Sequence, residues 1–148
     1  MAKVQSINVA GELAILLADT YALALKTQNY HWNVTGAEFY SLHKLFEGQY
    51  ESLHDAADEI AERIRALGAY APGGFAEFAK ITNISDAKEG ASSKEMLQDL
   101  AKSHAAIVSQ AKKVLETAES AGDDATIDMV VGRIEEHDKQ AWMLNSSL

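Results

Sequence analysis

The sequence predicts an all-α protein built from four long helices. It has 148 residues, with one proline, nine glycines and 47% hydrophobic residues, and it contains few runs of β-branched residues, which favours helices over strands. Apolar residues recur at helical spacing in four long stretches that glycine-containing turns separate. At this length the chain is most simply one domain, residues 1–148, large enough to bury a core.

The first two helices follow from their apolar faces and the glycines that end them. The first is expected from about Val9 to Trp32, with Gly36 marking its end; its apolar face consists of Leu13, Leu16, Leu17, Tyr21, Ala24 and Leu25. The second is expected to begin near Ala37 or Glu38 and to run to Leu67. Gly68 then serves as its C-terminal stop.

The second half of the chain contains a long connection and two further helices. After residues 71–74, Phe75 to Lys80 is expected to form one short helical turn before a polar stretch. Ser92 and Glu95 form a capping box that opens a third helix, which is expected to run to about Ala121. Asp123 or Asp124 can cap the fourth. Four helices with one long crossover between the second and third describe a ferritin-like bundle.

Composition excludes several classes of site and partner. The chain has no cysteine, so disulfides, zinc–thiolate sites and iron–sulfur clusters are excluded. The formal net charge of −9 opposes nonspecific attraction to nucleic acid and suits cation accumulation, although an acidic surface kept for solubility also explains it. The first eight residues contain no apolar signal core, and Glu12 and Asp19 interrupt the next apolar stretch. We therefore expect a cytoplasmic protein that does not enter a membrane.

The second helix has one stripe of side chains that bind metals. The stripe falls within roughly 100° of the helix surface and borders an apolar sector; it comprises His43, Glu47, Glu51, His54, Asp58 and Glu62. Partly buried carboxylates and imidazoles need partners, and one cation can serve several of them. The alternative is that Asp58 and Glu62 lie on a solvent-exposed face of the helix, where their carboxylates form surface ion pairs with Arg63 or Arg65.

The stripe is too long for a single metal site within one chain. His43 and Asp58 lie 15 residues apart, about 22 Å along a straight helix. An antiparallel copy of the helix across a two-fold axis would bring the His43–Glu47 pair of one subunit to the Asp58–Glu62 pair of the other. The sequence therefore predicts a dimer with metal at its interface.

An intrachain di-iron centre is the less favoured alternative. Such centres use two Glu-x-x-His motifs from different helices. Glu51 and His54 form one such motif, but the second motif is missing because Glu135, Glu136 and His137 have the wrong spacing. Glu51 and His54 are thus auxiliary metal ligands, or His54 is a partly exposed histidine on the helix face.

The residues around this stripe resemble a known family. The run His31-Trp32-Asn33-Val34-Thr35-Gly36, followed by Phe39, Leu42-His43, Glu47, Asp58 and Ala61-Glu62-Arg63, is similar to the signature of Dps-type mini-ferritins, the DNA-protecting proteins of starved cells. The resemblance extends more weakly over the whole chain. It implies a hollow shell of twelve four-helix subunits. It also implies oxidation of iron at sites shared between two subunits, with hydrogen peroxide as the preferred oxidant and ferric mineral stored inside.

By position, the resemblance implies that His31, His43 and Glu47 come from one subunit and Asp58 and Glu62 from its partner. Many relatives have Asp in place of Glu47, whose longer side chain keeps the charge but can shift the ligand toward the second metal position. Imidazole and carboxylate ligands suit ferrous iron, while zinc, manganese or copper could occupy the same groups. Without these companions, His31 would most often be a capping or packing residue.

Two further features carry both a structural and a functional interpretation. Trp32 is by default a core residue at the bundle edge, and the resemblance implies that it donates an electron to stray oxidising species. Asp123, Asp124 and Asp128 match the region that lines three-fold ion pores in the family, but such residues also cap helices and interact with helix N-termini. Both roles can coexist.

Three functions are consistent with the sequence. The favoured hypothesis is a peroxide-consuming ferroxidase and iron-storage cage, a homododecamer built on two-fold dimers that limits hydroxyl-radical damage. The alternatives are a nucleoid-compacting DNA-binding protein and a structural or surface-interaction cage. Direct DNA binding is not favoured, because the N-terminal segment offers only Lys3 and the last four residues offer no lysine or arginine.

Overall fold

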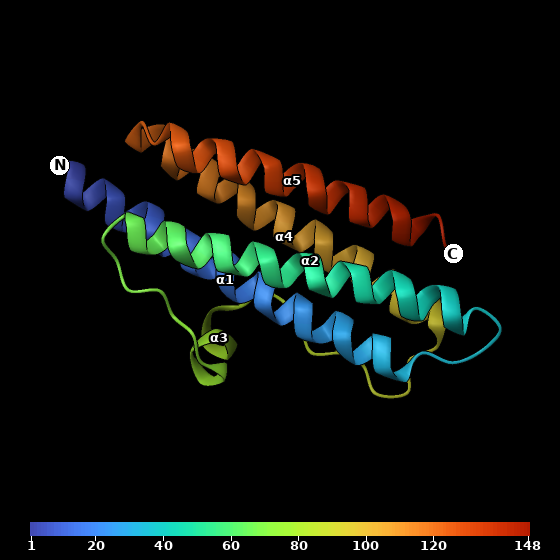
Figure 1. Cartoon of the computed structure of the whole chain (residues 1–148). Coiled ribbons are helices and arrows are strands. Elements are labelled where there is room, and N and C mark those ends of the chain that lie inside the picture. Colours follow the sequence, from blue (N-terminus) through green and yellow to red (C-terminus); the bar gives the residue numbers. More distant parts are fainter.

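The structure, a computed structural model that describes residues 1–148, is all-helical. Four long helices run side by side, and a short helix lies against the outside of the bundle (Figure 1). The helices are α1 (Ala2–Asn33), α2 (Phe39–Ala66), α3 (Phe75–Ile81), α4 (Ser93–Ala121) and α5 (Asp124–Asn145). This order confirms the predicted bundle with a long crossover carrying a short helix between the second and third long helices.

Helix α1 is the central element of the bundle. It packs against α2, α3 and α4, while α5 packs against α4 and α2. By length and composition α1 could cross a membrane, but 56% of its most apolar window is buried inside the bundle, as expected for a core helix. Helix α1 begins at Ala2, seven residues before the predicted start. The first turns were not predicted because they have no continuous apolar face, and their apolar residues Val4 and Ile7 are exposed.

The helix ends follow the predicted capping chemistry. Ser92 accepts a hydrogen bond from the backbone N–H of Glu95, and the Glu95 side chain accepts one from the backbone N–H of Ser92, which completes a capping box at α4. Gly122 adopts φ 66° at the end of α4, a left-handed conformation that favours glycine. Asp123 caps α5 by accepting from the backbone N–H of Thr126.

Buried polar side chains of α1 hold the crossover in place. Asp19, which is fully buried, accepts hydrogen bonds from the Thr82 hydroxyl at 2.8 Å and the Asn83 backbone N–H at 2.6 Å. Lys26, which is only 3% exposed, donates to Ser85 of the crossover at 3.2 Å and to Asp99 in the first turns of α4 at 3.1 Å. A different path of the crossover would leave these buried polar groups without hydrogen-bond partners. The contacts therefore favour a single conformation of the crossover against α1.

A tyrosine at the end of α1 completes this attachment. The Tyr30 hydroxyl donates to Asp99 at 2.6 Å and accepts from the backbone N–H of Lys88 at 3.0 Å. Burial, followed by the hydrogen bond to Asp99, raises the pKa of Tyr30 to about 12. The phenol therefore stays protonated, and it fixes the turn of α1 that precedes His31.

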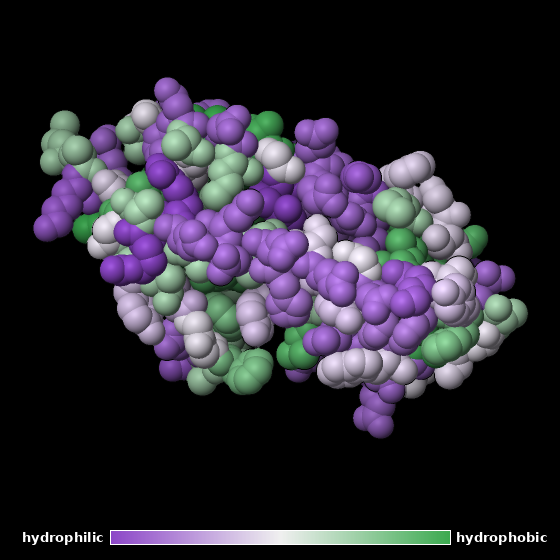
Figure 2. Space-filling model, viewed as in Figure 1, coloured by the Kyte–Doolittle hydropathy of each residue, from purple (hydrophilic) through white to green (hydrophobic).

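The exterior over α2 and α5 is mainly hydrophilic, with hydrophobic residues in small separate areas (Figure 2). The bundle interior instead holds a continuous apolar core to which α1, α2 and α4 contribute most of the side chains. The stripe of predicted metal ligands on α2 lies outside this core, at the surface of a single chain.

Candidate metal centre

Two histidines meet where α1 ends and α2 begins. His31 Nδ1 lies 2.7 Å from the carbonyl oxygen of His43, and His43 Nδ1 lies 2.7 Å from the carbonyl oxygen of His31. Because a carbonyl only accepts, each Nδ1 carries the hydrogen, which leaves the Nε2 lone pair of a neutral ring free to bind a metal. The two rings stack with centroids 3.7 Å apart. Each backbone carbonyl therefore fixes the orientation of the other histidine ring. Histidines that bind metals are usually held in the same way, by a hydrogen bond from the ring nitrogen that does not bind the metal.

Glu47 lies one helical turn after His43 and has a lysine as its partner. Its carboxylate accepts a hydrogen bond from Lys44 at 2.7 Å. That hydrogen bond lowers the pKa of Glu47, so the carboxylate is charged at neutral pH. The Lys44 side chain is half exposed, and such surface pairs are weak. A cation could therefore replace it.

Asp58 and Glu62 form the second group of ligand types. They lie on successive turns of α2, and both are exposed. The hydrogen bond to Asp58, together with its negative charge, raises the pKa of Glu62, because two neighbouring carboxyl groups compete for one proton. A bound cation would relieve this repulsion and displace the proton.

The structure does not bring these two groups together within one chain. No cluster of three or more histidine, aspartate or glutamate side chains suited to a metal forms in the chain. His31, His43 and Glu47 lie toward the start of α2, whereas Asp58 and Glu62 lie near its other end. Neither group forms such a cluster by itself, so a site that joins them stays a prediction that involves a second copy.

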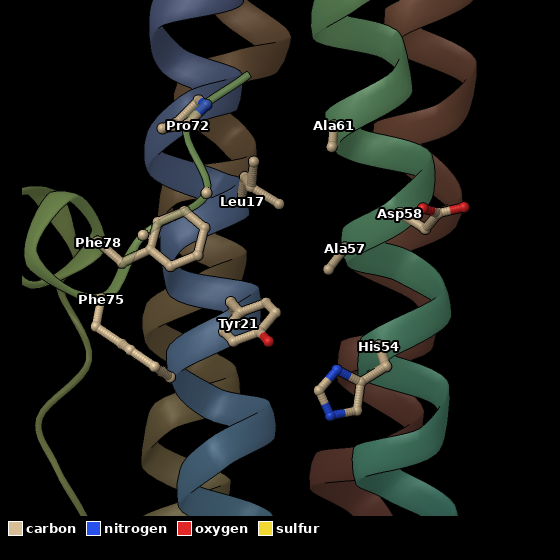
Figure 3. Close-up of a pocket in the computed structure, with 11 residues that line it drawn as sticks. Leu17, Tyr21, His54, Ala57, Asp58, Ala61, Pro72, Phe75 and Phe78 are labelled. Atoms are coloured by element: carbon tan, nitrogen blue, oxygen red, sulfur yellow. The ribbon is translucent and has the colours of Figure 1, made fainter.

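Glu51 and His54, the predicted auxiliary ligands, lie between the two groups along α2. His54 contacts the rings of Tyr21 and Tyr50 edge-on, with centroids 5.6 and 6.2 Å apart, and Figure 3 shows it projecting from α2 toward Tyr21. Glu51 is exposed. Trp32 is 59% exposed in a single chain, so it is not the core residue that its default interpretation predicts. It borders a pocket of about 480 Å³ between α1 and the crossover.

Comparison with known proteins identifies the family. The sequence model of the Ferritin-like domain family matches residues 11–148. The chain is 35% identical over 132 residues to DNA protection during starvation protein 2 of Bacillus anthracis, covering 89% of this chain and 90% of that protein. The chain belongs to the Dps-type mini-ferritins.

Solved structures of this mini-ferritin family have the same fold. The Dps structure from Staphylococcus aureus is similar with a TM-score of 0.91 and 35% identity, covering 95% of this chain and 94% of that one. The structure of the DPS protein from Vibrio cholerae O1 has a TM-score of 0.93 and 33% identity, covering 97% and 91%. That protein is described as a member of a broad superfamily of ferritin-like diiron-carboxylate proteins.

In this mini-ferritin chain, the aspartates of the predicted pore region differ in environment. Asp123 pairs with Arg63 at 2.7 Å and accepts hydrogen bonds from Thr126. Partial burial opposes its ionisation, but the hydrogen bonds from Thr126 and Arg63 outweigh burial and lower the pKa of Asp123. Asp123 therefore has a capping role, whereas Asp124 and Asp128 are exposed on α5. A pore role for the three stays a prediction.

A buried polar group in the bundle interior was not predicted from the sequence. His104 Nδ1 lies 2.9 Å from His137 Nδ1, and Arg133 Nη2 lies 3.4 Å from His137 Nε2. Because arginine only donates, His137 Nε2 accepts, His137 Nδ1 donates to His104, and the Nε2 hydrogen of His104 has no partner. Gln49 of α2 is likewise buried without a side-chain partner. In the sequence, His104 stands at an ordinary core position of its helix.

Tyr50 was also missed, although the sequence contained a signal for it. It falls on the face of α2 that holds the stripe, seven residues after His43 and four before His54. Tyrosine is not among the residue types of the predicted metal-binding stripe, so the stripe does not include it. The structure places its ring against His31 and His54.

Proposed function

We propose that this chain forms a mini-ferritin cage that oxidises Fe(II) to Fe(III) with hydrogen peroxide and stores the product. The observation that carries the proposal is the separation of two complementary partial ligand sets on α2. One offers the fixed imidazoles of His31 and His43 with Glu47, and the other offers the paired carboxyls of Asp58 and Glu62. Antiparallel pairing of two copies would complete two equivalent sites.

The ligand chemistry suits the oxidation of iron, which is the substrate here. Nitrogen and oxygen ligands bind Fe(II), and the three carboxylates favour Fe(III) because they neutralise more positive charge. Two Fe(II) ions at one site can each give one electron: H₂O₂ + 2 Fe(II) + 2 H⁺ → 2 Fe(III) + 2 H₂O. Peroxide is then reduced by two electrons without release of hydroxyl radical.

The proposal extends to assembly and to DNA protection. The name of the Bacillus anthracis relative states protection of DNA during starvation. With a net charge of −9, we expect this chain to protect DNA by removing iron and peroxide instead of coating the DNA. A homododecamer of two-fold dimers would enclose the stored ferric mineral. A DNA band shift at low salt by the purified protein would contradict the absence of direct binding.

The site is tested by Fe(II) titration of the purified protein under anaerobic conditions, followed by addition of peroxide. Asp58→Asn/Glu62→Gln should lose tight Fe(II) binding and rapid oxidation while particle mass stays unchanged, because it removes the negative charge of the second ligand group. Glu89→Gln neutralises an exposed carboxylate of the crossover and is the matched control. Rapid oxidation in the double variant would refute the site assignment.

Sharing between subunits has a test of its own. His43→Gln and Asp58→Asn/Glu62→Gln chains are produced together, so that mixed dimers form. If each site takes its histidines from one subunit and its carboxylates from the other, a mixed dimer contains one intact site and one site with both defects. Oxidation should therefore reappear in the mixture although each variant alone is inactive. A mixture as inactive as its components would exclude shared sites.

A further inference from the structure

Seven aromatic and imidazole rings form a continuous series along the groove between α1 and α2. In contact order this ring series is Phe39, His43, His31, Tyr50, His54, Tyr21 and Phe78. Successive centroids are 5.0, 3.7, 5.2, 6.2, 5.6 and 5.3 Å apart. The second and third rings are the histidines of the first ligand group, and the series ends in a pocket of about 350 Å³ that Asp58 of the second group also lines.

Figure 3 shows the end of the series beside α2, where His54 projects toward Tyr21 and the Asp58 carboxylate points to the other side of the helix. Tyr21 projects from α1 into the groove, with its hydroxyl directed toward the side from which His54 extends, and Phe78 lies beside it from α3. Asp58 follows His54 by one turn of α2. The ring series therefore covers most of the length of α2 between the two ligand groups and ends one helical turn before Asp58, beside a pocket that Asp58 also lines.

In the dimer of the proposed function, those two groups belong to different iron sites. The first group of a chain completes one site, and the second group of the same chain completes the other. We propose that the ring series carries single electrons between the two iron sites of a dimer, with Tyr50 and Tyr21 as the oxidisable relays. This inference rests on the proposed function and extends it to the case in which a site holds only one iron.

A site with one Fe(II) is one electron short of reducing peroxide completely. A tyrosine supplies the missing electron: H₂O₂ + Fe(II) + Tyr–OH + H⁺ → Fe(III) + Tyr–O• + 2 H₂O. The phenol proton leaves to the water that reaches these half-buried side chains. Fe(II) at the other site then restores the tyrosine: Tyr–O• + Fe(II) + H⁺ → Tyr–OH + Fe(III). The sum of the two steps is the complete two-electron reaction.

Tyrosine is the suitable relay because its phenol gives up one electron and one proton together, whereas imidazole and phenylalanine rings are much harder to oxidise. His31 and His54 connect the tyrosines to the ligand groups through ring contacts. Packing alone would account equally well for rings of any kind at these positions. Replacing tyrosine by phenylalanine separates the two explanations, because it keeps the ring and removes the oxidisable group.

The experiment adds peroxide to anaerobic protein loaded with Fe(II) and records electron paramagnetic resonance spectra and hydroxyl-radical spin adducts. With one Fe(II) per dimer, the wild-type protein should show a tyrosyl radical, which disappears as loading rises to one Fe(II) per site. Tyr50→Phe should lose this loading-dependent radical and release more hydroxyl radical at low iron. Tyr70→Phe, which changes an exposed tyrosine outside the ring series, should behave as wild type.

The outcomes distinguish the inference from the function on which it depends. If the wild-type protein at full loading fails to oxidise Fe(II) with peroxide, the proposed function is wrong. If it oxidises Fe(II) normally but Tyr50→Phe keeps the wild-type radical and its dependence on iron loading, the relay is refuted. A radical that Tyr70→Phe removes and Tyr50→Phe preserves would place the oxidised residue outside the ring series and refute the relay as well.

Discussion

Acid should destabilise this bundle because two histidines are buried in its interior without charge. His104 and His137 are fully buried, and the guanidinium of Arg133 lies beside His137. Burial, followed by the charge of Arg133, lowers the pKa of His104 from 6.5 to about 4. Burial, followed by the charges of His104 and Arg133, lowers the pKa of His137 in the same direction.

The sign and size of the effect follow from these pKa values. Below its ordinary pKa of 6.5, His104 takes up a proton in the unfolded chain but stays neutral in the folded protein until about pH 4. Stability is therefore present above pH 6.5 and is lost as the pH falls through this window. At about 1.4 kcal/mol per pKa unit, His104 alone accounts for about 3 kcal/mol. That is a large part of the roughly 5–15 kcal/mol that stabilises a typical domain.

The assay is urea unfolding followed by helical circular dichroism at several pH values between 7 and 4. Carboxylates also contribute to acid lability, so the informative quantity is the difference between wild type and His104→Leu/His137→Leu. The double variant removes both histidines and the proton uptake that they undergo on unfolding, so it should make the free energy of unfolding fall less steeply with acid. His54→Gln, at an exposed position, should keep the wild-type slope. Equal slopes for wild type and the double variant would refute the reasoning.

Three further changes test the packing of the crossover and the helix ends. Lys26→Met should reduce the free energy of urea unfolding by about 1.5–3 kcal/mol, because Asp99 loses its buried ammonium partner and keeps only the Tyr30 hydroxyl; an unchanged free energy of unfolding would contradict this. Ser92→Ala removes the acceptor for the Glu95 backbone N–H and should cost about 1 kcal/mol, whereas Ser92→Asp should retain most of the stability. Gly122→Ala places a side chain at φ 66° and should lower the free energy of unfolding by about 1–2 kcal/mol. For Gly122→Ala, an unchanged urea midpoint would show that the turn relaxes without strain.

The sequence by itself determined the helices and the placement of the predicted metal ligands in one stripe of α2. Local chemistry decides both: Ser92 and Glu95 cap α4 whatever the rest of the chain does, and residues on successive turns of one helix must share a face. The distance between His43 and Asp58 along α2 follows from helix geometry alone. That is why incomplete ligand groups and the need for a second copy could be predicted, while the shared site itself stays a proposal.

Only the tertiary structure decided how side chains far apart in the sequence meet. The two carbonyl hydrogen bonds that fix His31 and His43 depend on the exact approach of α1 and α2. The buried contact between His104 and His137 joins two helices that could pair in several registers, and it has no local signature. Helical periodicity shows which face a residue occupies, but packing between helices determines which group it touches, because that depends on the register and rotation of each helix against its neighbours.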